Sequence, residues 1–121
     1  MEKNDALAAF AALSQPTRLD VIRHLIAAGE DGLLAGEIAE RLSVRANTLS
    51  ANLSILLQAG LVSKRREGRS IRYCAELDGL RALIGFLLQD CCGGRPELCQ
   101  PLIESVGRAS APQNQNVMEG S

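Results

Sequence analysis

The stretch LAGEIAERLSVRANTLSANLSILLQAGLV, residues 34–62, decides how this chain folds. Its first apolar residues recur at helical spacing and predict a short helix over 34–42. After a brief turn at Ser43, a second apolar stripe predicts a helix over about 46–59, and Gly60 suits a left-handed stop. Two helices joined by so short a turn are typical of a helix-turn-helix unit.

Two helices are expected before this unit. Apolar residues at helical spacing (Leu7, Phe10 and Leu13) predict a first helix over about 5–13. A second helix is expected over 16–29, because proline is tolerated in the first turn of a helix.

After residue 60 the apolar period changes. Residues 61–65 and 70–74 are predicted to form two short strands, joined by a turn at Glu67-Gly68, as a hairpin with a basic tip. A fifth helix is expected from Asp78, and its apolar residues form a seam. This seam consists of Leu80, Leu83, Ile84, Leu87 and Leu88. The predicted fold is therefore mainly α with a small β-hairpin, a winged helix-turn-helix.

The length favours a single domain. With 121 residues the chain is too short for two ordinary cores. A sixth short helix is expected from Pro96 to about Val106, so the domain is predicted to span 1–107. The tail over 108–121 is polar and expected to be disordered. Charges interrupt every apolar stretch before it could span a membrane, and no signal-peptide pattern opens the chain, so a cytoplasmic protein without a membrane partner is expected.

The charge pattern favours a nucleic-acid partner despite a net charge of −1. The segment KRREGRSIR, residues 64–72, carries five basic residues and one acidic residue. Local positive charge, rather than the charge of the whole chain, governs phosphate contacts. A solvated charged loop without a partner would give the same pattern.

The second helix of the unit carries small polar residues in its N-terminal half. Such side chains let a helix enter the major groove and offer donors and acceptors to base edges. Alternatively, they only cap and solvate the helix. Together with the hairpin they give the predicted DNA-binding set, which is Arg45, Asn47, Thr48, Ser50, Asn52, Lys64, Arg65, Arg66, Arg69 and Arg72.

Several ordered motifs resemble the ArsR/SmtB family of repressors. They are LSQPTRL at 13–19, TLSANL at 48–53, AGLV at 59–62, and the wing residues Arg65, Gly68, Arg69 and Tyr73. The resemblance implies a homodimeric repressor that leaves an inverted-repeat operator on double-stranded DNA when an inducer binds. It also implies a dimer interface built from the first helix and the seam that begins at Leu80. Many members carry histidine where this chain has Asn52.

The family's best-known metal motif is missing from its usual place. Many members carry Cys-Val-Cys on the first helix of the helix-turn-helix unit, where this chain has AGEIAE at 35–40. His24 is the only histidine, and it is expected to be structural because it lies in an apolar stripe.

The thiols cluster instead after the fifth helix, in the segment DCCGGRPELC at 90–99. Cys91 and Cys92 extend the apolar seam, and Gly93-Gly94 followed by a proline would let Cys99 return toward them. Three converging thiolates suit a soft ion of low coordination number, so the expected effector is As(III), with trivalent antimony or methylated arsenite as related candidates. Tetrahedral zinc would need a fourth ligand.

Other roles for these cysteines stay open. Cys91 and Cys92 could be small apolar fillers of a dimer seam, or two thiols could bind without the third. A disulfide from either of them to Cys99 would make a redox or persulfide sensor. Cys74 is expected to be structural. No Cys-x-x-Cys pair, Cys/His couple or glycine-rich phosphate loop supports an enzyme.

Overall fold

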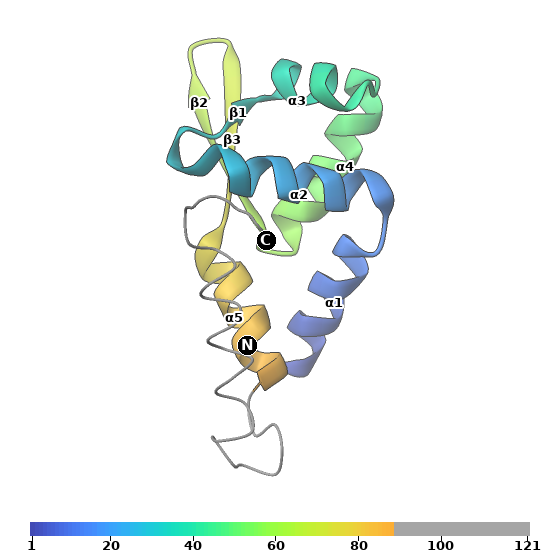
Figure 1. Cartoon of the computed structure of the whole chain (residues 1–121), viewed down its shortest axis with the longest axis vertical. Coiled ribbons are helices and arrows are strands. Elements are labelled where there is room, and N and C mark those ends of the chain that lie inside the picture. The colour runs from blue at the N-terminus through green and yellow to red at the C-terminus, as the bar shows by residue number, and fades with distance from the viewer. Residues whose placement is uncertain (89–121) are drawn as a thin grey trace, which may run out of the picture. The chain divides into compact units, whose positions relative to one another are not determined.

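A computed structural model describes residues 1–88 of the chain, and residues Met1–Phe86 form one compact unit. The element order agrees with the prediction of a winged helix-turn-helix, with one added strand (Figure 1). In chain order the elements are α1 (Lys3–Leu13), α2 (Pro16–Ala28), a 3-10 turn η1 (Gly29–Asp31), β1 (Leu33–Leu34), α3 (Ala35–Leu42), α4 (Ala46–Gln58), β2 (Val62–Glu67), β3 (Ser70–Ala75) and α5 (Leu77–Leu88).

The helix-turn-helix consists of α3 and α4, as predicted. Ser43 ends α3 in the left-handed conformation, with φ of 54°, and its N–H bonds to carbonyls of the last turn. The inner side of α3 buries Ile38, and that of α4 buries Leu49, Leu53 and Leu56. These side chains join one core with α2, so the apolar stripe of each helix fixes which residues face outward.

The hairpin of β2 and β3 is the predicted wing, and Gly68 takes the positive φ of its turn. A third strand, β1, was not predicted from the sequence because it has only two residues. Leu33 pairs with Tyr73 and Leu34 with Arg72, which gives the antiparallel order β1-β3-β2. The wing is therefore connected to both ends of the helix-turn-helix. Strand β1, which pairs with β3, directly precedes α3, and β2 follows α4 (Figure 1).

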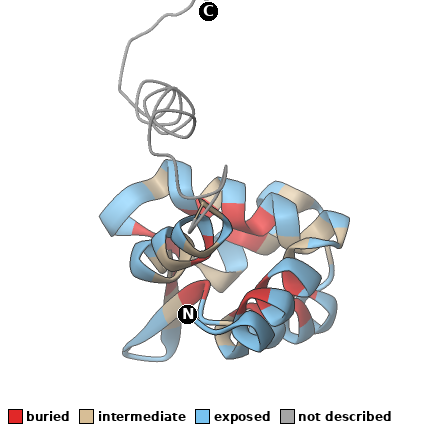
Figure 2. Ribbon diagram, turned by 90° about the horizontal axis from the view of Figure 1, so that it is seen from below, coloured by how far each residue is buried: buried red, intermediate tan, exposed pale blue. Residues whose placement is uncertain are grey.

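Helix α1 contacts the core through small side chains. Its buried residues are Ala6, Ala9 and Ala12, whereas Leu7 and Phe10 are exposed. The predicted helix is therefore present, and these two large apolar side chains face away from the core of this chain. Figure 2 shows the same division, with buried segments on the inner sides of the helices and exposed segments outside.

Helix α5 also leaves apolar side chains uncovered. Of the predicted seam, Leu83 is buried, Leu80 packs against the core, and Ile84 and Leu87 are exposed. A close backbone approach places α5, since a side chain at Gly79 would collide with the carbonyl of Gly60. Within the described residues, no helix has the length and apolar character that crossing a membrane requires.

Candidate nucleic-acid interface

The N-terminal half of α4 presents four of the predicted side chains to solvent. Arg45 is the extended N-cap residue, and Asn47, Thr48 and Ser50 follow it on the exposed side of the first turns. The Asn47 Oδ1 accepts from the Thr48 N–H at 2.8 Å and so satisfies one backbone donor in the first turn of α4. The amide N–H groups of Asn47 are not used in that bond. The arrangement offers hydroxyl, amide and guanidinium groups from one helical end.

Asn52 departs from the prediction that it contacts DNA. It is only 7% exposed, and among the described residues it is the one buried polar side chain. Its Oδ1 accepts from Arg18 Nη1 at 2.9 Å and its Nδ2 donates to the Thr48 carbonyl at 3.1 Å. The reason is its position, because residues 49, 52, 53 and 56 share the inner stripe of α4.

The wing divides its basic residues between two faces. Side chains alternate along a strand, so Lys64 and Arg66 lie on the face of Tyr73, while Arg65 and Arg72 share the other face with Glu67. All except Arg72 are exposed, and Arg72 is half-buried. Arg69 lies at the turn, one residue after Gly68.

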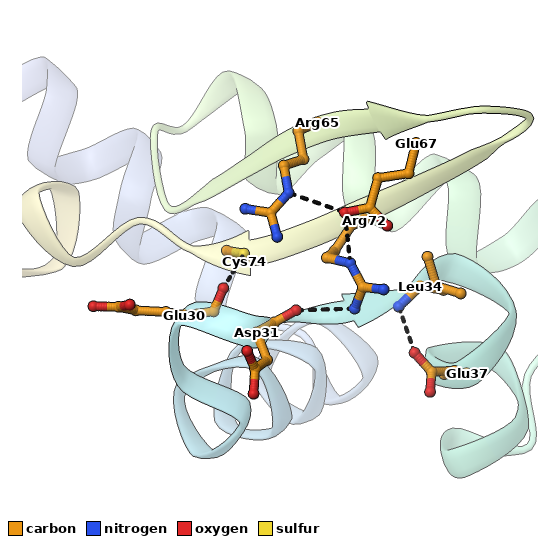
Figure 3. A network of polar contacts seen from close by, with 8 residues as sticks. All are labelled: Glu30, Asp31, Leu34, Glu37, Arg65, Glu67, Arg72 and Cys74. Carbon is orange, nitrogen blue, oxygen red and sulfur yellow. Dashed lines mark hydrogen bonds and ion pairs between the residues drawn. The ribbon is translucent and has the colours of Figure 1, made fainter.

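Glu67 holds two of the wing arginines (Figure 3). Its Oε2 accepts from Arg72 Nε at 2.9 Å and from Arg65 Nε at 3.1 Å. Hydrogen bonding to Arg72 and then to Arg65 lowers the pKa of the Glu67 carboxyl, and the same bond raises the pKa of Arg72. One carboxylate thus partly neutralises the basic cluster on this face.

The same face fixes the wing to η1. Arg72 Nη1 donates to the Asp31 carbonyl at 2.9 Å, and the Cys74 thiol lies 3.6 Å from the Glu30 carbonyl (Figure 3). A side chain at Gly32, where φ is +60°, would collide with the Tyr73 carbonyl and the Cys74 sulfur. The base of the hairpin is therefore anchored, whereas its tip carries exposed charge.

A groove of about 630 Å³ separates the helix-turn-helix from the wing. Ser50 of α4 and Arg69 of the turn both line it. Apolar lining comes from residues such as Leu49 and Tyr73, and α3 contributes the carboxylates Glu37 and Glu40. The groove thus brings together two predicted residues, Ser50 and Arg69, which are 19 positions apart in the chain. Helical polar groups and wing charge can therefore address one duplex, through the major groove and the phosphates.

The predicted thiol site, Cys91, Cys92 and Cys99, lies outside the described residues. Over residues 1–88 no three histidine, cysteine or carboxylate side chains come together to hold a metal ion. Cys74 is half-buried at the wing base. His24, expected to be structural, has its Nδ1 2.9 Å from the Asp20 carbonyl of its own helix.

Three curated proteins show what kind of regulator this chain is similar to. Transcriptional repressor SdpR from Bacillus subtilis is 34% identical over 65% of this chain and 84% of its own length. Transcriptional activator HlyU from Vibrio cholerae is 32% identical over 72% of this chain and 80% of its own. The putative arsenical resistance operon repressor ArsR of Halobacterium salinarum is 36% identical over 63% and 58%, respectively.

Solved structures agree with this similarity. HlyU from Vibrio cholerae superposes with a TM-score of 0.59 at 30% identity, over 76% of this chain and 99% of that one. A homodimeric winged helix-turn-helix domain from Mycobacterium bovis shares the fold, with a TM-score of 0.59 at 24% identity over 92% of this chain and 89% of its own.

These observations define a winged-helix DNA-binding protein. The helix-turn-helix domain family matches residues 13–65, which include α2, α3, α4 and the start of the wing. The chain belongs to the ArsR-type family of transcriptional regulators.

Proposed function

We propose that the chain is a homodimeric repressor that binds an inverted-repeat operator and releases it when As(III) binds Cys91, Cys92 and Cys99. The observation that carries DNA binding is the joint surface of α4 and the wing, with Asn47, Thr48 and Ser50 exposed beside a basic hairpin. Exposed small polar groups on a helical end are suited to base edges, and the hairpin charges are suited to phosphates.

The exposed apolar residues of α1 and α5 support the dimer. Leu7 is 56% exposed and Phe10 39% exposed on α1, and Ile84 of α5 is 45% exposed. Large apolar side chains left on two helices are typical of a self-association surface. A symmetric dimer would present two α4 helices to half-sites about one DNA turn apart, roughly 34 Å.

The choice of effector rests on the chemistry of the thiols. Cys91 follows the last residue of α5 by three positions, so a ligand held there acts at the end of a proposed dimer helix. Three thiolates match the sulfur preference of As(III). The similarity to a protein named for arsenical resistance supports the same choice.

In this proposal, DNA is released because the thiol site after α5 is coupled to the arrangement of the two subunits. A ligand that ties the residues after α5 would favour one arrangement of the two subunits and so change the spacing of the α4 helices. A coupling of about 1–3 kcal/mol is typical, which corresponds to a loss of operator affinity of roughly 5- to 150-fold.

A titration of bound DNA tests this proposal. The wild-type protein selects a duplex from a random-sequence library, and fluorescence anisotropy follows its release by arsenite, zinc or a persulfide donor. We expect arsenite to release the duplex from the wild type and from the control Cys74→Ser, but not from Cys91→Ser or Cys99→Ser. Release by arsenite from the Cys91→Ser and Cys99→Ser variants contradicts the thiol site. A response to the persulfide donor alone would assign a redox sensor instead.

A further inference from the structure

A chain of hydrogen bonds runs from the end of α1 to the exposed turn of α4. Arg18 is the third residue of α2, and its side chain bonds to both α1 and α4. Its Nε donates to the Ala12 carbonyl at 2.6 Å, and its Nη1 donates to Asn52 Oδ1 at 2.9 Å. The Asn52 Nδ2 then donates to the Thr48 carbonyl.

Each member of this chain has only one workable orientation. The Asn52 oxygen must face the guanidinium, which only donates, and its NH₂ group must face the Thr48 carbonyl, which only accepts. The Ala12 carbonyl lies in the last turn of α1, where helical carbonyls lack backbone partners, and a cation is favoured there. The backbone N–H of Arg18 donates to Oε1 of Gln15, the N-cap residue of α2, at 2.8 Å, so the start of this helix is fixed as well.

The partners of the Arg18 side chain favour a role in positioning α4 over a role in stability alone. The Arg18 side chain bonds to two neutral amide groups, the Ala12 carbonyl and the Asn52 side chain, and no carboxylate of the described residues forms an ion pair with it. Partial burial of a cation without an opposite charge costs solvation free energy, and an apolar residue of similar volume would avoid that cost. The fork of the guanidinium, however, fixes two acceptors in one geometry.

We propose that Arg18 is a positioning residue that sets the orientation of α4 for reading DNA and couples it to α1. The bond to Asn52 reaches the turn that bears Thr48, with Ser50 exposed beside it, so Arg18 fixes how those groups are presented. The bond to Ala12 ties the same network to the helix whose outer face carries Leu7 and Phe10. A displacement of α1 would therefore reach the reading surface through hydrogen bonds.

Binding to two duplexes tests the role without any effector. Arg18→Met is compared with Arg23→Met, which removes the same charge from an exposed position of α2. The probes are the duplex selected by the wild type and a scrambled duplex of equal length. We expect Arg18→Met to lose at least tenfold affinity for the selected duplex and less than twofold for the scrambled one. Arg23→Met should keep the wild-type ratio.

The salt dependence separates positioning from a direct phosphate contact. A lost phosphate contact would weaken both duplexes and reduce the slope of log Kd against log salt by about one. We expect an unchanged slope, and an Asn52→Leu plus Arg18→Met double variant no worse than either single variant.

Folding is checked by thermal unfolding, and Arg18→Lys and Asn52→Asp serve if Arg18→Met does not fold. They retain the charge of Arg18 and the acceptor of Asn52, respectively, but break the two-ended geometry, so the same loss of discrimination is expected. A folded variant that keeps the wild-type ratio of affinities overturns the proposal. A uniform loss with a smaller salt slope overturns it as well, whether or not the proposed dimer and effector are correct.

Discussion

The recognition helix and the wing lie on either side of one groove, but they hold their polar groups differently. On α4, Asn47, Thr48 and Ser50 are exposed on a well-packed helix. On the wing, Glu67 already engages Arg65 and Arg72. The helix therefore offers rigidly placed groups suited to specificity, while the wing holds part of its charge in internal pairs. Affinity and specificity are expected to respond to different substitutions.

The largest effect is expected from a negative charge on the exposed side of α4. Ser50→Glu should weaken binding to any duplex by about a hundredfold or more. A carboxylate placed in the major groove would be repelled by the DNA phosphates and would lose its hydration. Fluorescence anisotropy measures the loss. Gln58→Glu adds the same charge at the exposed far end of the helix and should change the affinity less than threefold. Equal losses of affinity in both variants would show that α4 does not enter the major groove of DNA.

The attachment of the wing to η1 can be disrupted without changing any charged residue of the wing. Gly32→Ala should destabilise the fold by about 1–3 kcal/mol, since Gly32 has φ of +60° and a side chain would collide with β3. Urea unfolding gives the value. Gly36→Ala is the matched control, because nothing lies near that position in α3, and it should be neutral or stabilising. A stable Gly32→Ala protein would mean that η1 does not anchor the hairpin.

Removal of the Glu67 charge should sharpen the contrast between wing and helix. Glu67→Gln removes the carboxylate that binds Arg65 and Arg72, so both the selected and the scrambled duplex should bind a few-fold more tightly, with a steeper salt dependence. Glu30→Gln removes an equal charge and should matter less. A gain confined to the selected duplex would show that the wing reads sequence.

The smallest effect concerns acidity. Because the pKa of Glu67 is lowered in the folded chain, its contribution to stability is present above the ordinary glutamate pKa, about 4.3, and is lost as the pH falls through the lowered value. Wild type and Glu67→Gln should therefore differ slightly in urea unfolding at neutral pH and converge in acid. The pairs are exposed, so the difference should be small. A difference that grows in acid would contradict the assignment.

The sequence predicted the fold better than the contacts of single side chains. The leucine stripe and Gly60 were enough to place α4, because the helical period determines which side is buried. The same period would have placed Asn52 inside, had it been weighed above the polarity of the residue. Its partner Arg18 lies 34 positions away, and no local pattern reveals that pair.

Other features depend on packing that a sequence does not display. The spacing of Leu7, Phe10 and Leu13 predicts α1, but it does not reveal that the alanines of this helix are the residues buried in the core. The hold of Glu67 on Arg72 depends on the register of the hairpin, which pairs Arg65 with Arg72. The strand β1 is too short to produce an alternating pattern.

The salt dependence of binding by Asn47→Ala and Arg69→Gln tests the division of labour most directly. Kd is measured for the selected and the scrambled duplex over a range of salt concentrations. Asn47→Ala should weaken only the selected duplex, by about 1–3 kcal/mol, with an unchanged slope. Arg69→Gln should weaken both duplexes alike and reduce the slope by about one. The reverse pattern, or the same pattern in both variants, would contradict a reading helix flanked by a phosphate-binding wing.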